Sequence, residues 1–192
     1  MIINLESFEY FTFSWYNTSI EKIEKYLSEN VLIKFNIKKY CQQNNAINYE
    51  YNPKTFTANF MKLNDGVIML PNLLDGWITL FNNIIENLKI NGYYFVISSE
   101  KINKSHNCMI YMENGIRKRV CYTLKDNSKW TFYENGEPLF FEDKENYKNK
   151  LKKDKMNKDI LLNYCNELKI ITGHELKIEN TNNNIRIEYK NV

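Results

Sequence analysis

The sequence has few of the residues that usually build an active site. It holds two histidines, His106 and His174, and neither has further potential ligands at the spacing of a metal site. The six glycines are scattered, and no GxGxxG, GxxxxGK, GxSxG or HExxH pattern occurs. We therefore expect no metal, no cofactor and no phosphate-binding loop, and we expect both histidines to lie in solvated loops.

Cysteine is scarce as well. The four cysteines are widely spaced and form no CxxC pair, which favours free thiols that are buried as small hydrophobic side chains in a reducing cytosol. They are Cys41, Cys108, Cys121 and Cys165. A nucleophilic pair of His106 with Cys108 or Cys121 stays open as an alternative.

Long apolar runs and strong charge are also missing. No apolar run approaches the roughly 20 residues that span a bilayer, and the first residues lack the basic region and cleavage site of a signal peptide. The net charge is +3, with 8 basic and 10 acidic residues over 1–100 and 18 and 13 over 101–192. Neither half is basic enough to indicate nucleic-acid binding. The sequence therefore predicts a cytoplasmic protein without a membrane or nucleic-acid partner.

Hydrophobic residues make up 43% of the chain and aromatic residues 15%, which is enough to fill a core. Runs of β-favouring residues are separated by turn signals such as Asn114-Gly115 and Asn135-Gly136, and this pattern is typical of an antiparallel meander. Strands are expected at 8–16, 31–37, 47–51, 56–61, 67–70, 93–98, 108–113, 116–124, 129–134 and 139–141, with a last hairpin of 176–179 and 185–189.

Three helices are expected, each from an apolar stripe at helical spacing. The first follows a capping box of Thr18 and Glu21. The second has Asp75 as its cap and Gly92 as a left-handed residue at its end. The third follows residues 144–158, whose seven lysines indicate a solvated, helix-forming segment. The stripes are Ile20, Ile23 and Leu27; Trp77, Leu80, Phe81, Ile84, Ile85 and Leu88; and Ile160, Leu161, Tyr164, Cys165 and Leu168.

Taken together, these elements predict an α+β fold, in which an antiparallel β-sheet, a meander, carries about three helices packed on it. We expect residues 1–192 to form a single α+β domain. A subdivision near residues 65–72 is the alternative, because a separate strand-helix-strand run precedes it.

The stretch WTFYENGEPLFFED, residues 130–143, combines aromatic and acidic side chains. Strand alternation places Trp130, Phe132 and Glu134 on one face and Tyr133 on the other. The acids are expected to form a charged rim that faces a protein partner, with Tyr133 as an aromatic anchor. The alternative is that these acids are only solvated. The expected partner-binding residues are Tyr133, Glu134, Glu137, Glu142 and Asp143.

Residues 70–170 resemble bacterial immunity proteins of contact-dependent inhibition and polymorphic toxin systems. The resemblance is carried by DGWITLF, FVISSE and KWTFYENGEPLFFED, followed by YKNKLKKDKMN. It implies a cytosolic antitoxin without enzymatic activity, which binds a cognate toxin domain and blocks its active site or substrate entry. Many such toxins are nucleases and their inhibitors are commonly acidic, whereas this chain has a net charge of +3.

Two other functions stay open. A small enzyme could assemble its site from residues that are distant in sequence, because active sites are built in space. A regulatory or structural protein-interaction module would also have a compact core without a catalytic motif.

Overall fold

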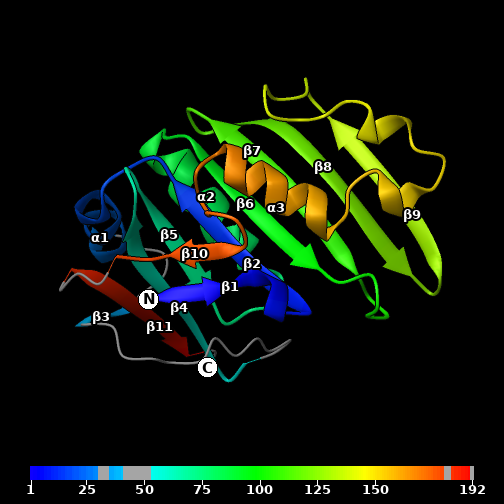
Figure 1. The fold of residues 1–192 in the computed structure, drawn as a ribbon. Helices are drawn as coiled ribbons and strands as arrows, with labels where there is room; N and C mark the ends of the chain where they lie inside the picture. Colours follow the sequence, from blue (N-terminus) through cyan, green and yellow to red (C-terminus); the bar gives the residue numbers. More distant parts are fainter. Residues whose placement is uncertain (30–34, 41–52, 180–182, 191–192) are drawn as a thin grey trace.

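The computed structural model describes residues 1–29, 35–40, 53–179 and 183–190. These residues form one nine-stranded antiparallel sheet, ordered β3-β11-β4-β5-β2-β6-β7-β8-β9, and a small sheet of β1 and β10 (Figure 1). The strands are β1 (Ile2–Asn4), β2 (Tyr10–Tyr16), β3 (Asn36–Tyr40), β4 (Thr55–Leu63), β5 (Gly66–Pro71), β6 (Gly92–Ser98), β7 (His106–Glu113), β8 (Ile116–Asp126), β9 (Lys129–Asn135), β10 (Glu175–Lys177) and β11 (Asn184–Lys190).

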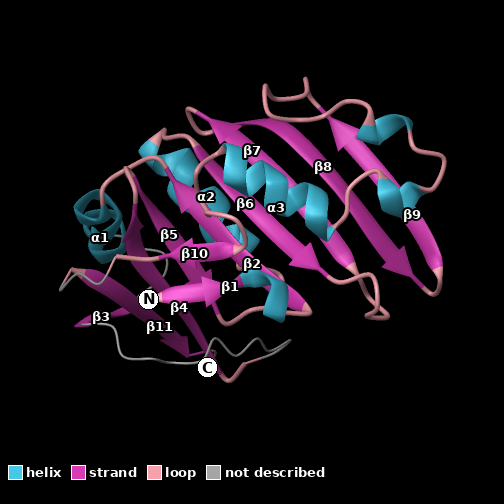
Figure 2. Cartoon of the chain, in the orientation of Figure 1, coloured by secondary structure: helices cyan, strands magenta, loops and turns pink. Residues whose placement is uncertain are grey.

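Helices cover both faces of the large sheet (Figure 2). One face packs against α1 and α2, and the opposite face packs against α3 and the small sheet. This arrangement confirms the predicted α+β fold with three helices on an antiparallel sheet. The helices are α1 (Ile20–Glu29), α2 (Ile78–Leu88) and α3 (Lys158–Glu167), and the short 3-10 helices are η1 (Leu5–Ser7), η2 (Asn146–Lys148) and η3 (Lys152–Asp154).

The meander from β6 to β9 follows the predicted turns. At Asn114-Gly115 both residues have positive φ, 50° and 79°, as a type I′ hairpin turn requires. Asn127 and Ser128, with φ of 46° and 73°, make the next tight turn in the same way. Neighbouring strands β6, β7, β8 and β9 pair in sequence order, so local turn chemistry sets this half of the sheet.

The apolar stripe of α2 is buried as predicted, except for the half-buried Leu88 at its end. The predicted cap is wrong, because the residue before α2 is Trp77 in a left-handed conformation and no described side chain caps the helix. Asp75 instead accepts a hydrogen bond from the Trp77 amide at 2.9 Å in the preceding turn. The role predicted for Gly92 is wrong. The left-handed residue at the end of α2 is Lys89, with φ of 51°. Gly92 instead opens β6, where a Cβ atom would lie 2.8 Å from the Trp15 carbonyl oxygen and would collide with Ile85. Close packing therefore explains this glycine.

Several expected boundaries differ in the structure. Ser19 rather than Thr18 caps α1, since its Oγ accepts from the Lys22 amide at 3.4 Å. The stretch 139–141 is a turn and no strand, because the chain leaves the sheet at Gly136. The lysine-rich segment contains only the short helices η2 and η3, and the regular helix α3 begins at Lys158.

The predicted last hairpin is also wrong. The strand β10 pairs with β1, and β11 inserts between β3 and β4, so the two strands belong to different sheets. A local sequence pattern cannot distinguish a hairpin from two strands with distant partners. The expected strand 47–51 and Cys41 lie outside the described residues, as does the first part of the expected strand 31–37.

Candidate interaction surface

The hairpin of β8 and β9 has two faces with different surroundings. On one face, Arg119, Cys121 and Thr123 of β8 are buried beneath the segment 137–157. Met156 belongs to this cover, because its carbonyl oxygen accepts a hydrogen bond from the Thr123 hydroxyl.

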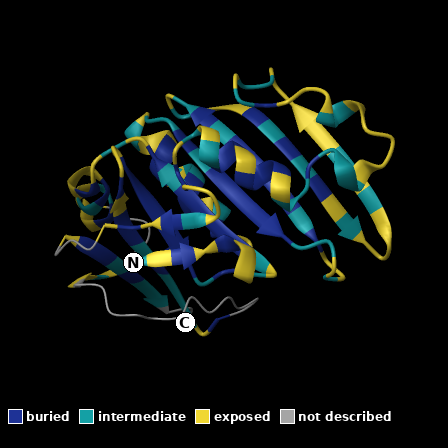
Figure 3. Cartoon of the chain, in the orientation of Figure 1, coloured by how far each residue is buried: buried dark blue, intermediate teal, exposed yellow. Residues whose placement is uncertain are grey.

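On the opposite face, Val120 and Tyr122 of β8 are half-buried against the core cluster that includes α2. Among the described residues, no helix lies over that face of β9 (Figure 2). Most residues of β9 are exposed, in contrast to the buried centre of the sheet (Figure 3). We call the side of the hairpin away from the segment 137–157 its open face.

The open face is aromatic. Tyr133 is 45% exposed and stacks on Tyr122 of the neighbouring strand, with 5.3 Å between the ring centroids. His106 meets the Tyr122 ring edge-on at 6.0 Å, and Leu124 is 37% exposed beside it. Cross-strand pairing sets Tyr133 opposite Tyr122 and Thr131 opposite Leu124. The predicted alternation in β9 is thus confirmed, with Tyr133 on the face opposite to Phe132. We call Tyr122, Leu124, Thr131 and Tyr133 the open aromatic face.

Glu142 does not lie on a charged rim, and this expectation is corrected. Its side chain is fully buried and accepts hydrogen bonds from Arg119 Nε at 3.0 Å and Arg119 Nη2 at 2.8 Å. It also accepts from the Leu139 amide at 2.8 Å and from the Tyr147 hydroxyl. A carboxylate that leaves water is retained only when such partners satisfy it. Glu142 therefore holds the segment 137–157 onto β8.

Arg119 is the other half of this buried centre. Its Nη1 donates to the Gly136 carbonyl oxygen at 2.7 Å, and its Nη2 donates to Glu134 at 2.7 Å. Burial lowers the pKa of the guanidinium, but the hydrogen bonds that it donates to Glu142 and Glu134 outweigh burial and hold this pKa above its usual range. No sequence pattern marked Arg119, because it belongs to the basic run Arg117-Lys118-Arg119, which looks solvated.

The remaining acids do not form one patch with Tyr133. Glu134 points to the face opposite to Tyr133 and is tied to Arg119, with 39% of its side chain exposed. Glu137 and Asp143 are exposed, and Asp143 accepts a hydrogen bond from the Glu145 amide at 3.0 Å. The structure therefore separates the predicted aromatic anchor from most of the predicted acidic rim.

The groups that could act as nucleophiles or bases are buried or half-buried. His106 begins β7 instead of lying in a loop, and burial lowers its pKa to about 4. Burial raises the pKa of the Cys108 thiol, and that of Cys121 to about 12, so both thiols are protonated at neutral pH. Cys121 also faces the opposite side of the sheet from His106. This geometry does not support a nucleophilic pair.

His174 is half-exposed next to Glu6, and its Nδ1 contacts the Glu6 carboxylate. The expected free thiols are borne out for Cys108, Cys121 and Cys165, which are all buried. Within the ranges that the structure describes, no three His, Cys, Asp or Glu side chains come together as a metal-binding group.

A shallow groove lies beside the carboxyl end of α3. It comprises two adjoining hollows of about 720 Å³ and 230 Å³, which share Trp15, Asn17 and Leu168. The smaller hollow also has the stacked rings of Tyr93 and Tyr111, whose centroids are 4.8 Å apart. Sequence reasoning missed this groove because its walls come from segments that are far apart along the chain.

Comparison of the sequence with protein-family models and with curated proteins, and of the fold with solved structures, finds no match. The resemblance to immunity proteins therefore stays a prediction. None of the described helices has both the length and the apolar character needed to cross a membrane.

Proposed function

We propose that this protein is a cytoplasmic immunity protein that binds a cognate bacterial toxin domain and blocks its active site. The observation that carries the proposal is the open aromatic face of β8 and β9. Tyr133 and Leu124 are exposed there, and Tyr133 stacks on the half-buried Tyr122 of the neighbouring strand. A second, independent support is the resemblance of residues 70–170 to immunity proteins.

A protein is the partner that this surface fits best. Tyrosine is favoured at the centre of protein interfaces, because it offers a large contact area and one polar group at low entropic cost. The open aromatic face contributes no acidic or basic side chain of its own, so it suits the apolar centre of an interface. Burial on one side by the segment 137–157 keeps the hairpin in place before the partner arrives.

Charge plays a smaller part than the sequence predicts. Glu142 is removed from the partner-binding set because its side chain is buried. Glu137 and Asp143 remain as exposed acids that would steer a basic partner, and Glu134 contributes through its exposed part. In such a rim, carboxylates change the association rate more than the dissociation rate.

The test is binding and protection. A candidate toxin domain from a neighbouring gene is produced with the protein, and the two are co-purified and assayed for toxin activity. We expect Tyr133→Ala to weaken binding at least tenfold and to reduce protection. The matched control is Phe140→Ala, because Phe140 is 87% exposed but belongs to the turn at 140–141, outside the open aromatic face.

Two outcomes would count against the proposal. If the wild-type protein neither co-purifies with the toxin domain nor protects against it, the proposed function is wrong. If it protects, but Tyr133→Ala and Phe140→Ala bind as well as wild type, the toxin docks elsewhere. Charge reversal by Glu137→Lys and Asp143→Lys, measured at low and high salt, shows whether the exposed acids steer association.

A further inference from the structure

The outer edge of β9 carries unpaired backbone groups, because β9 is the last strand of the large sheet. The two-residue turn at Asn127 and Ser128 makes Asp126 and Lys129 a hydrogen-bonded pair. Along the hairpin, hydrogen-bonded pairs of opposite residues then alternate with pairs that are not hydrogen-bonded to each other. Trp130, Phe132 and Glu134 consequently direct their N–H and C=O groups away from β8.

This edge is open to pairing. No backbone hydrogen bond from another described segment reaches Trp130, Phe132 or Glu134. The register with β8 is regular over all of β9, and the strand holds no proline and no bulge. Proline, bulges, short length and charged side chains protect an edge strand against pairing. β9 has seven residues without proline or bulge, and its charged residues Lys129 and Glu134 lie near its two ends.

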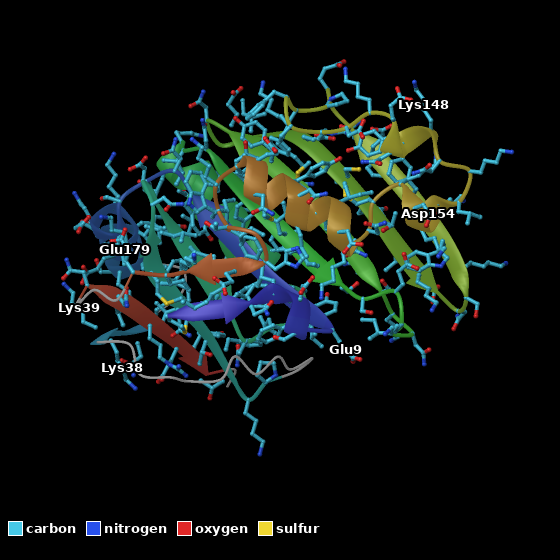
Figure 4. All side chains as sticks on the ribbon, in the orientation of Figure 1. Glu9, Lys38, Lys39, Lys148, Asp154 and Glu179 are labelled. Atoms are coloured by element: carbon cyan, nitrogen blue, oxygen red, sulfur yellow. The ribbon has the colours of Figure 1, made fainter. Side chains whose placement is uncertain are left out.

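The two sides of this edge differ in charge. On one side η3 lies against β9, and Lys148 and Asp154 mark the lysine-rich segment at this end of the molecule (Figure 4). Lys150 and Lys152 are exposed and form no ion pair with a described residue. On the other side the edge continues the open aromatic face through Thr131 and Tyr133.

We propose that the free edge of β9 accepts an extended segment of a partner protein as an additional antiparallel strand. The segment alternates acidic with apolar residues. Its acidic side chains face the lysines of residues 148–155, and its apolar side chains lie beside Tyr133. Backbone hydrogen bonds hold such a strand, while alternate side chains give specificity.

A second copy of this chain is a poorer occupant. Pairing β9 with its own copy around a two-fold axis would bring two lysine-rich segments close together, and their like charges would repel. The inference rests on the proposed function in one respect, because the toxin domain would supply the strand. The experiment below does not need the toxin, so the two proposals can fail separately.

The probe is a synthetic, end-blocked peptide of eight residues that alternates glutamate with valine or tyrosine. Two control peptides carry lysine in place of each glutamate or a scrambled order. Binding to the full chain is measured by calorimetry at low salt. We expect the acidic peptide to bind and the lysine peptide to bind at least tenfold more weakly. The double variant Lys150→Glu with Lys152→Glu should bind the acidic peptide more weakly than the wild type, by a similar factor.

The variants that test strand addition are Trp130→Pro and Trp130→Ala. Both remove the indole, but only proline removes the outward N–H, so we expect the proline variant to bind at least tenfold more weakly than the alanine variant. Circular dichroism checks that both are folded. Hydrogen exchange in the wild type is the second measurement, independent of any variant. The peptide should slow exchange of the Phe132 amide, which points outward, and leave the Thr131 amide unchanged.

The inference is overturned if the acidic peptide does not bind, or if the lysine peptide binds equally well. It is also overturned if the Phe132 amide exchanges at the same rate with and without the acidic peptide. A concentration-dependent dimer of the wild type that Trp130→Pro abolishes would show that the occupant is a second copy, and would replace the acidic partner.

Discussion

The aromatic side chains in the centre of the large sheet and those at its β8–β9 end have opposite surroundings. In the centre, β2, β5 and β6 have helices or the small sheet on both faces, and Phe13, Tyr16 and Phe95 are fully buried. At the β8–β9 end only one face is covered, and Tyr133 is 45% exposed. Aromatic residues in a strand therefore do not by themselves tell whether their face is covered within the chain.

The largest expected effect belongs to the covered region. Trp77 is 9% exposed and packs against the rings of Phe35 and Phe56 at 6.1 and 5.7 Å. We expect Trp77→Ala to lower the free energy of unfolding by roughly 3–5 kcal/mol, because it removes a large buried side chain. Denaturant unfolding measures this, with Phe140→Ala as the exposed control. A loss below about 1 kcal/mol would mean that this side of α2 is accessible.

On the covered face of the β8–β9 end, the stability of the protein should depend on the buried ion pair of Arg119 and Glu142. We expect Glu142→Leu to lower the free energy of unfolding by about 3 kcal/mol, because it leaves Arg119 buried with only Glu134 as a charged partner. The double variant Arg119→Leu with Glu142→Leu should recover much of this loss. The control Glu137→Leu, at an exposed acid, should change stability by roughly 0.5 kcal/mol or less. If Glu142→Leu and Glu137→Leu lowered the free energy of unfolding equally, the buried ion pair would not stabilise the fold as we expect.

The titration of His106 tests how far solvent reaches the edge of the open aromatic face. Burial lowers its pKa to about 4, whereas an unfolded histidine titrates near 6.5. Between these values the unfolded chain takes up a proton that the folded protein does not, so stability is full above about pH 6.5 and falls with pH down to about 4. Because the side chain is partly exposed, we expect a loss of roughly 2 kcal/mol.

The matched variant for this prediction is His106→Phe, which keeps a ring beside Tyr122 and cannot titrate. The free energy of unfolding of both proteins is measured from pH 7 to pH 4. The difference between them should change across this window. Parallel curves would show that His106 is solvated when folded.

The smallest effect on stability is expected on the open aromatic face. Tyr133→Ala removes a stacked cross-strand pair, and such pairs contribute roughly 0.2–1 kcal/mol. Tyr16→Ala, at a fully buried tyrosine in β2, should cost several times more. If Tyr133→Ala destabilised the isolated protein by more than about 2 kcal/mol, this face would be covered within the chain and could not be an interface.

Much of the β6–β9 meander could be predicted, because its information is local. Asn114-Gly115 adopts the positive φ angles that its hairpin needs, and alternation in β9 separates Tyr133 from Phe132. The last hairpin could not be predicted, since β10 and β11 find their partners in β1, β3 and β4. The residues next to a strand in the sequence do not indicate which distant strand it will pair with.

The candidate site shows the same division between local and distant information. The sequence alone determined that Tyr133 and Glu134 lie on opposite faces, because side chains alternate along any strand. Only the tertiary structure decided that Glu142 is buried, since this depends on Arg119, 23 residues away, meeting it beneath the segment 137–157. Whether an acid is solvated or paired is a property of the charges that folding brings near it, and strand periodicity carries no information about those charges.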